Sequence, residues 1–341
     1  MNDILEALLT ALRQGQSVVM CAIVDSSGSA PRTSGARMLV FPDGTIQGSV
    51  GGGPVEGACQ RHAAKLPLDN GAYDTMSFDL SSSTAAEAGM VCGGAARVLL
   101  QRITPEHIDF FARLDELVRN RQRPTLATIL TETAAPLLAL WSQGDGWQGP
   151  AIPTPMAEEL ARKAAKSRQP FRLESEGLRI FAEPVVSPGV VHLVGAGHVA
   201  KAVATVADFA GFEVVVMDDR ADFANAERYP RARDVRVLSN FDGCLADLGE
   251  DDYVIIVTRG HVHDRDVLAQ ALRTNAGYIG MIGSKSKRAA VYRSLLESGY
   301  TQADLDRVFC PIGLPIGADT PHEIAISIVG ELIQARAGAA R

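Results

Sequence analysis

The sequence predicts an α/β chain with two domains, a mixed α+β domain followed by a doubly wound parallel sheet. The 341 residues are enough to build two separate cores. The turn-forming segment Ser187-Pro188-Gly189 separates the halves, which gives domains over residues 1–187 and 188–341. After this turn, apolar runs of strand length alternate with helical patterns, whereas before it strands often follow one another.

The first domain combines several short strands with a few helices, as expected of an α+β domain. Turn signals such as Pro42-Asp43-Gly44 separate the apolar runs. Residues 144–155 are rich in glycine and proline and are expected to form a loop. The expected strands cover 18–24, 36–41, 45–50, 73–80, 95–103, 126–130 and 137–141, with a hairpin over 173–186, and the expected helices cover 4–12, 55–66, 105–120 and 156–168.

The second domain alternates strands with helices, which predicts a parallel sheet covered on both faces. Its last helix begins at a capping box, in which Thr320 is the N-cap, Pro321 follows and Glu323 completes the box. The expected strands cover 190–194, 213–217, 254–257 and 278–282, and the earlier helices cover 199–210, 267–273 and 285–297.

A dinucleotide-binding motif, Gly195-Ala196-Gly197-His198-Val199-Ala200, follows the first of these strands. Gly195 permits the tight turn, Gly197 lets the backbone approach a pyrophosphate, and Ala200 permits close packing of helix on strand. The motif predicts a Rossmann domain.

An acidic pair stands where such a domain binds ribose, because Asp218 lies 218 − 195 = 23 residues after the first glycine and Asp219 follows it. The predicted cofactor-binding set of this motif is therefore Gly195, Gly197, His198, Asp218 and Asp219. An aspartate at this place favours NAD over NADP. Binding of another phosphate-bearing group, without redox chemistry, stays an equal alternative.

Two further loops are expected at the same edge of the sheet. In Thr258–Asp264, His261 is a candidate cofactor ligand. A metal site made of His261, His263 and Asp264 is less expected than an anion site or an internal role for Asp264. Ser284 and Lys285 begin a helix whose N-terminus suits an anion, or is simply a solvated, capped start. Residues 311–317 read as a shaped loop near the site.

The first domain carries glycine motifs of its own, Gly28-Ser29-Ala30-Pro31-Arg32 with Gly35-Ala36-Arg37-Met38, and residues 48–56. Backbone N–H groups of Gly51, Gly52 and Gly53 are candidates for cradling a phosphate, beside Glu56. Arg32 and Arg37 would add charged contacts. The alternative is that these glycines only form tight turns.

Cys92 stands in Met90-Val91-Cys92-Gly93-Gly94, where small neighbours let a ligand approach the sulfur. A thiolate is a soft metal ligand, and a thiol can carry a persulfide. The residues alone favour the alternative, a buried structural thiol. The five cysteines form no CxxC pair, so a reducing, cytoplasmic location is expected.

The composition argues against two partner classes. Asp and Glu outnumber Lys and Arg by 40 to 33, for a net charge of -7, which disfavours a nonspecific nucleic-acid binder. The chain also lacks a basic N-terminal start and an apolar run of the roughly 18 residues that a membrane helix needs.

Taken together, the motifs resemble those of the XdhC/CoxI family of xanthine dehydrogenase accessory proteins. The first domain resembles the family's N-terminal domain at residues 28–32, 48–56 and 90–94. The second resembles its Rossmann domain at residues 195–200, 279–285 and 311–323. The resemblance spans nearly the whole chain, and its motifs are long and ordered.

The resemblance implies a chaperone rather than a catalyst. Such a protein binds molybdenum cofactor (molybdopterin with its metal), holds it while a cysteine desulfurase supplies sulfur, and inserts it into the apo-enzyme of a molybdenum hydroxylase such as xanthine dehydrogenase. It implies that Cys92, with Gly93 and Gly94, contacts the cofactor and that Cys92 is the candidate metal ligand. One branch of the family has a cysteine where this chain has Pro54, so a two-cysteine site is not expected.

Two alternatives use the Rossmann domain instead, an NAD(P)-dependent oxidoreductase and a nucleotide-sensing module. NAD(P) therefore stays open as a second ligand. A homodimer is expected only because dimers are the commonest assembly.

Overall fold

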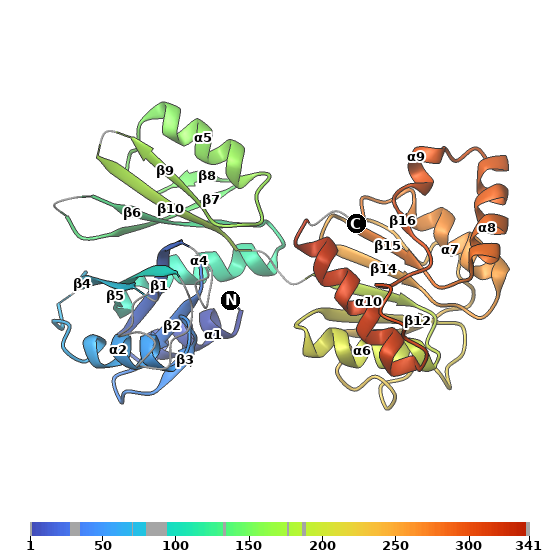
Figure 1. Cartoon of the computed structure of the whole chain (residues 1–341), viewed down its shortest axis with the longest axis horizontal. Coiled ribbons are helices and arrows are strands. Elements are labelled where there is room, and N and C mark those ends of the chain that lie inside the picture. Colours follow the sequence, from blue (N-terminus) through green and yellow to red (C-terminus); the bar gives the residue numbers. More distant parts are fainter. Residues whose placement is uncertain are drawn as a thin grey trace. The chain divides into compact units, whose positions relative to one another are not determined.

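The computed structural model divides into two compact units, Met1–Ser187 and Pro188–Arg341 (Figure 1). It describes residues 2–27, 35–69, 71–79, 94–131, 134–175, 177–185 and 189–338, without the side chains of residues 2, 261 and 262. Each unit is described separately below.

The N-terminal unit contains two five-stranded antiparallel sheets. The first sheet has the order β3-β2-β1-β5-β4 and the second sheet the order β8-β7-β6-β10-β9. The strands of the first sheet are β1 (Val18–Ser27), β2 (Arg37–Val40), β3 (Ile46–Gly48), β4 (Tyr73–Asp79) and β5 (Ala95–Ile103). Those of the second sheet are β6 (Thr125–Leu130), β7 (Leu137–Ser142), β8 (Gly146–Gln148), β9 (Phe171–Ser175) and β10 (Leu178–Pro184).

The helices described on these sheets are α1 (Asn2–Arg13), α2 (Gly53–Ala63), α4 (Ile108–Arg119) and α5 (Thr154–Ala164). A 3-10 turn over Pro105–His107 precedes α4. Helix α2 packs on one face of the first sheet through Val55, Cys59 and Ala63. Helices α1 and α4 pack on its other face, in a core that also includes Leu126 and Leu140 of the second sheet. Because β1 is covered on both faces, residues 18–24 are all buried, which explains their unbroken apolar run.

The C-terminal unit is built on a third sheet, which is parallel throughout and has the order β13-β12-β11-β14-β15-β16. This is the strand order of a dinucleotide-binding Rossmann fold, so the predicted fold class is confirmed. Its strands are β11 (Val190–Val194), β12 (Glu213–Asp218), β13 (Asp234–Val237), β14 (Asp252–Ile256), β15 (Tyr278–Met281) and β16 (Val308–Phe309).

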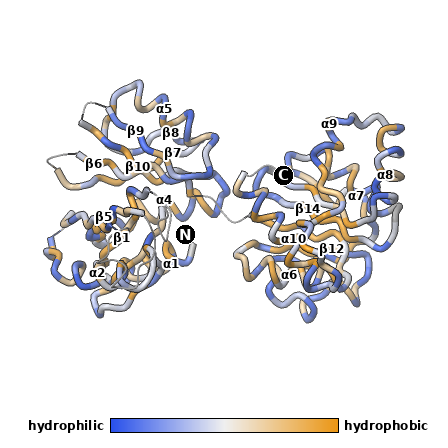
Figure 2. Tube along the Cα trace, viewed as in Figure 1, coloured by the Kyte–Doolittle hydropathy of each residue, from blue (hydrophilic) through white to orange (hydrophobic). Residues whose placement is uncertain are grey.

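Helices lie on both faces of the third sheet, and two hydrophobic clusters, one on each face, form its core. Figure 2 shows the hydrophobic stretches of β12 and β14 inside this unit. The helices are α6 (His198–Phe209), α7 (His261–Ala271), α8 (Lys285–Glu297), α9 (Gln302–Leu305) and α10 (Pro321–Arg336).

Three short strands were not expected. Strand β8 lies inside the segment predicted to be a loop, and β13 and β16 form the two edges of the third sheet. Strand β13 is only partly buried and β16 has two residues, so neither carries the long apolar run that marks a central strand.

Helix α7 begins earlier than predicted, at the polar residue His261.

Candidate functional site

The three N-terminal motifs attach to the same end of the first sheet. Strand β1 ends at Ser27, which lies opposite Ala95, the first residue of β5, and Ala95 also lies opposite Asp79, the last residue of β4. Strand β2 begins at Arg37 on this end, and β3 ends beside it at Gly48. Pairing between strands distant in the sequence therefore brings together the ends of segments 28–36, 49–52 and 80–94.

Within this group, the glycine turn before α2 already holds a carboxylate. Glu56 Oε1 accepts hydrogen bonds from the Gly52 N–H at 3.1 Å and from Ser49 Oγ at 2.6 Å. Glu56 thus occupies part of the anion position that the exposed N–H groups were predicted to offer to a phosphate. Its role as a direct cofactor contact stays a prediction, and in this structure it stabilises the turn.

The same turn has open space beside two of its glycines. Gly51 and Gly52 have φ values of 126° and 97°, which only glycine adopts easily. A Cβ added at Gly52 or Gly53 would meet no other atom of the described residues within 4 Å. Packing against the described residues therefore does not explain Gly53, and a ligand could approach the backbone on this side.

Arg37 does not point into a ligand site. It forms an ion pair with Glu183 of β10, and both side chains are almost completely buried. The pair joins the first sheet to the second, and Arg37 Nε and Nη1 find no hydrogen-bond partner in the described part of the chain. Burial raises the pKa of Glu183 to about 7, against the attraction of Arg37. The expected contact of Arg37 with an oxyanion is therefore wrong for this structure.

Three predicted site residues, Arg32, Cys92 and Gly93, lie outside the described residues. Gly94 is buried directly before β5. Cys59, the other cysteine near the glycine turn, is fully buried where α2 packs on the first sheet. It thus presents no thiol to a ligand.

In the C-terminal unit, the first two glycines of the motif suit their positions for different structural reasons. Gly195 has a φ of 107°, and a Cβ there would lie 2.6 Å from the carbonyl carbon of Val257. Gly197 has extended backbone, and a Cβ there would meet nothing within 4 Å. The turn itself requires glycine at 195. The space beside Gly197 is open, as the predicted approach of a pyrophosphate requires.

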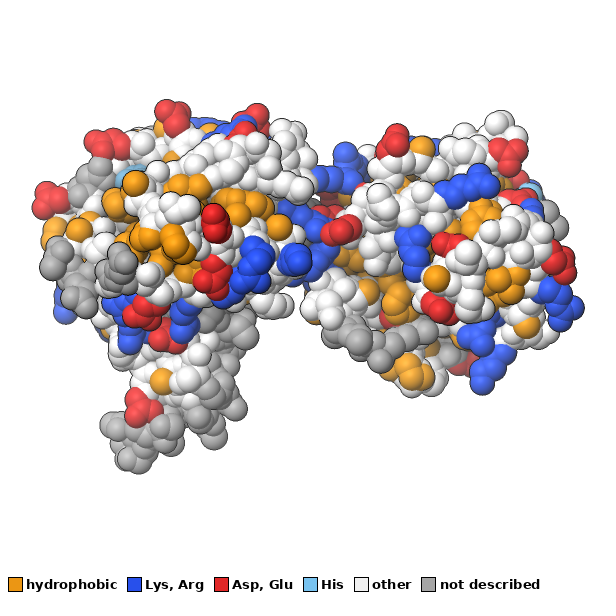
Figure 3. All heavy atoms as spheres, turned by 90° about the horizontal axis from the view of Figure 1, so that it is seen from above, with side chains coloured by type: hydrophobic (Ala, Val, Ile, Leu, Met, Phe, Trp, Pro, Cys, Tyr) orange, Lys and Arg blue, Asp and Glu red, His pale blue; other side chains and the backbone are white. Residues whose placement is uncertain are grey.

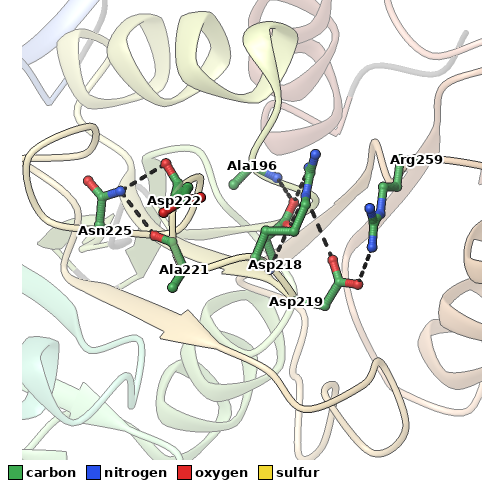
Figure 4. A network of polar contacts seen from close by, with 8 residues as sticks. Ala196, Asp218, Asp219, Ala221, Asp222, Asn225 and Arg259 are labelled. Carbon is green, nitrogen blue, oxygen red and sulfur yellow. Dashed lines mark hydrogen bonds and ion pairs between the residues drawn. The ribbon is translucent and has the colours of Figure 1, made fainter.

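Asp218 and Asp219 both form contacts at the end of β12, between Ala196 and Arg259 (Figure 4). Asp218 accepts the Ala196 N–H at 2.7 Å and a bidentate contact from Arg220. Asp219 accepts from Arg259 Nη2 at 2.7 Å. The side chain of Asp218 is 2% exposed.

These hydrogen-bond donors stabilise the ionised form of Asp218. Burial disfavours ionisation, but hydrogen bonds from Arg220 and the Ala196 N–H outweigh it, and the pKa of Asp218 lies below its usual value. The preference for NAD rested on a free carboxylate at this position. That basis is absent, because Asp218 anchors the glycine turn and Arg220. Sequence reasoning missed Arg220, although it follows the acidic pair directly.

Only the backbone of His261, which begins α7, belongs to the described structure. His198 is exposed at the start of α6. His263 packs against the ring of Phe241, with centroids 5.0 Å apart. Asp264 is fully buried, accepts from Thr258 Oγ1 at 2.6 Å and forms an ion pair with Lys287. The internal role for Asp264 is thus favoured over the metal site.

Ser284 caps α8 as predicted, with its Oγ accepting the Lys287 N–H at 3.2 Å. Ser284 and Lys285 are exposed. The shaped loop after β16 is held by α10, where buried Glu331 accepts the Gly313 N–H at 2.9 Å and the Tyr278 hydroxyl at 2.5 Å. Glu331 gave no sequence signal, because its partners lie 18 and 53 residues away.

Within the described residues, no three His, Cys, Asp or Glu side chains are placed to hold a metal ion. None of the described helices is both long and apolar enough to cross a membrane. On the face drawn in Figure 3, basic and acidic side chains are interspersed in both units.

Two family models match this chain. A model of the XdhC and CoxI family matches residues 11–79, and a model of the XdhC Rossmann domain matches residues 191–332. The two matched segments together cover more than half of the chain.

Relatives and a solved structure resemble the chain over nearly its whole length. YqeB of Escherichia coli is 26% identical, and the matched region is 93% of this chain but only 43% of YqeB. A probable xanthine dehydrogenase component of Bacillus subtilis is 26% identical over 96% of each chain. The molybdenum cofactor insertion chaperone PaoD of Escherichia coli is 22% identical over 98% of this chain and 88% of PaoD. A crystal structure described as a xanthine dehydrogenase from Bacillus halodurans has a TM-score of 0.77 and 27% identity, covering 99% of this chain and 96% of that one.

Proposed function

Because the chain belongs to the XdhC and CoxI family, we propose that it is an accessory protein in the maturation of molybdenum cofactor. In this role it binds the cofactor as cargo, holds it while a cysteine desulfurase supplies the terminal sulfur, and inserts it into the apo-enzyme of a molybdenum hydroxylase. The names of two relatives, the insertion chaperone PaoD and the probable xanthine dehydrogenase component, support this role.

The convergence of motif ends at one end of the first sheet is the observation that carries the proposal. The strand ends that flank segments 28–36, 49–52 and 80–94 meet at this end of the first sheet, although they are far apart in the sequence. The proposed cargo site lies at this end. Open space beside Gly52 and Gly53 fits a group that approaches the backbone closely.

Cys92, which lies in the third of these segments, is proposed to contact the cofactor through its thiol, with Arg32, Gly93 and Gly94 beside it. Glu56 keeps the glycine turn in shape through Ser49 and Gly52, and so acts as a positioning residue. We expect the protein to act in the cytoplasm and as a homodimer.

Cofactor retention tests the proposal. The purified full chain is incubated with molybdenum cofactor and desalted, and its molybdenum and pterin contents are then measured. We expect near-stoichiometric retention by the wild type and a clear loss in Cys92→Ala. Cys244→Ala is the matched control, because this half-buried thiol belongs to the C-terminal unit.

The outcomes separate the parts of the proposal. Retention by the wild type and equal retention by Cys92→Ala would keep the chaperone role and exclude the thiol contact. No retention by the wild type would exclude the chaperone role itself.

A further inference from the structure

The carboxylate that a ribose would need in the C-terminal unit is already saturated. Asp218 receives four hydrogen bonds, from the backbone N–H groups of Ala196 and Arg220 and from Nε and Nη2 of Arg220. A carboxylate offers about four lone-pair positions. A ribose diol therefore finds no acceptor at Asp218 unless the contact with Arg220 breaks.

The neighbouring acid, Asp219, pairs through Oδ2 with Arg259 from the loop after β14. Its Oδ1 lies 3.8 Å from Arg220 Nε and accepts no hydrogen bond within the described residues. At the end of β12, the carboxylates of Asp218 and Asp219 thus already have arginine partners. Because arginines neutralise both carboxylates, an anionic substituent on the ribose meets less repulsion here than beside free aspartates, and it can contact the arginines directly.

Two guanidinium groups surround one aromatic ring beside this point. The guanidinium of Arg220 lies 3.8 Å from the centroid of Phe223, and that of Arg228 lies 5.1 Å from the same centroid. Asp218 fixes one edge of the Arg220 guanidinium, and no hydrogen bond from its Nη1 is found among the described residues. Both cations are thus held close to one ring at the end of β12, where an anion can contact either of them.

Arg228 also has unused donors. Its Nε and Nη2 are buried and have no hydrogen-bond partner in the described part of the chain. Such donors are costly unless something accepts from them. Arg228 lines a pocket of about 360 Å³ together with residues along α6, from Lys201 to Phe209, so its side chain borders open space.

We propose that the C-terminal unit binds a dinucleotide with a phosphate on its adenosine ribose, of the NADP type, in preference to the NAD type, and that Arg220 and Arg228 contact this phosphate. The pyrophosphate then lies over the open backbone at Gly197. This inference goes beyond the cofactor role and concerns a different unit, so cofactor retention can fail or succeed independently of it.

Calorimetric titration of the full chain with NADP⁺ and NAD⁺, at one fixed ionic strength, tests the inference, since the two ligands differ only in the ribose phosphate. We expect NADP⁺ to bind at least about tenfold more tightly, because hydrogen bonds to charged groups are the strong ones. Inorganic pyrophosphate serves as the control for a general anion effect.

Two variants are expected to respond differently. Arg228→Gln lowers the affinity for NADP⁺ about tenfold and leaves that for NAD⁺ unchanged. Arg220→Gln also weakens NADP⁺ binding but frees lone pairs of Asp218, so the affinity for NAD⁺ rises and the preference reverses. Arg233→Gln, which removes an exposed partner of Glu213, is the matched control and leaves the ratio unchanged.

Equal or tighter binding of NAD⁺, or saturable binding of neither nucleotide, would overturn the inference. A preference for NADP⁺ that survives both arginine variants would also overturn it, because another group would then hold the phosphate. Since Arg220→Gln removes a partner of a buried acid, Arg228→Gln keeps the test valid if the first variant folds poorly.

Discussion

The two glycines of the Rossmann motif are expected to differ sharply when each is replaced by alanine. At Gly195, a φ of 107° costs a residue with a side chain about 1–3 kcal/mol. The new Cβ would also lie 2.6 Å from the carbonyl carbon of Val257 and 2.9 Å from the Thr258 nitrogen, which forces β11 and β14 apart and costs about 1–3 kcal/mol more. Gly195→Ala is thus expected to lower the free energy of unfolding by about 2–6 kcal/mol.

Gly197→Ala is the matched control, because its backbone is extended and no atom lies within 4 Å of the added Cβ. It should cost at most about 1 kcal/mol, the difference between glycine and alanine at a helix N-cap. Gly197→Val, with its branched side chain, should instead block the approach of a nucleotide.

Urea unfolding of the full-length variants measures these differences. Far-UV circular dichroism follows both units, whereas tryptophan fluorescence follows the N-terminal unit, which contains Trp141 and Trp147, the only two tryptophans of the chain. We expect Gly195→Ala to shift the dichroism transition. The reasoning would be refuted if Gly195→Ala were as stable as the wild type, or if Gly197→Ala lost as much stability.

Two further predictions concern buried ion pairs. The pKa of Glu183 is raised to about 7, so its contribution to stability is complete below about pH 4.5 and is lost as the pH rises through 7. We expect the free energy of unfolding to fall by up to about 3 kcal/mol over this window. Urea titrations at several pH values measure this pH dependence, which Glu183→Gln is expected to remove. If the wild type and Glu183→Gln showed the same dependence of unfolding free energy on pH, Glu183 would be ionised throughout this window. Lys287→Met leaves Asp264 buried without its cation and should cost about 3–5 kcal/mol. The exposed Lys285→Met should change thermal stability little, and equal effects of the two lysines would contradict the ion pair's role.

Much of the C-terminal unit is predictable because its signals are local. The capping box of α10 forms as expected, with Thr320 Oγ1 accepting the Glu323 N–H and Glu323 accepting the Thr320 N–H. Strand and helix alternate in the sequence as they do in the fold, and the glycine motif lies between β11 and α6. Each of these features depends on residues only a few positions apart.

The N-terminal unit was predictable in its elements but not in their arrangement. Its apolar runs marked most strands, yet nothing local indicates that they form two sheets. The expected oxyanion contact of Arg37 failed because its partner, Glu183, lies 146 residues away. Likewise, the glycine turn offered N–H groups, and only the folded chain shows that Glu56 already accepts one of them.

The sequence by itself thus determined the Rossmann motif, the capping box of α10 and the family, since these depend on short-range patterns. Tertiary structure alone decided which motif ends meet at the first sheet and which charges neutralise one another. Asp218 illustrates the reason: its position marks a ribose site, but its chemistry depends on the donors that surround it. Those donors are the Ala196 N–H in the turn after β11 and the guanidinium of Arg220. Only their positions in space show that both oxygens of the carboxylate already accept hydrogen bonds.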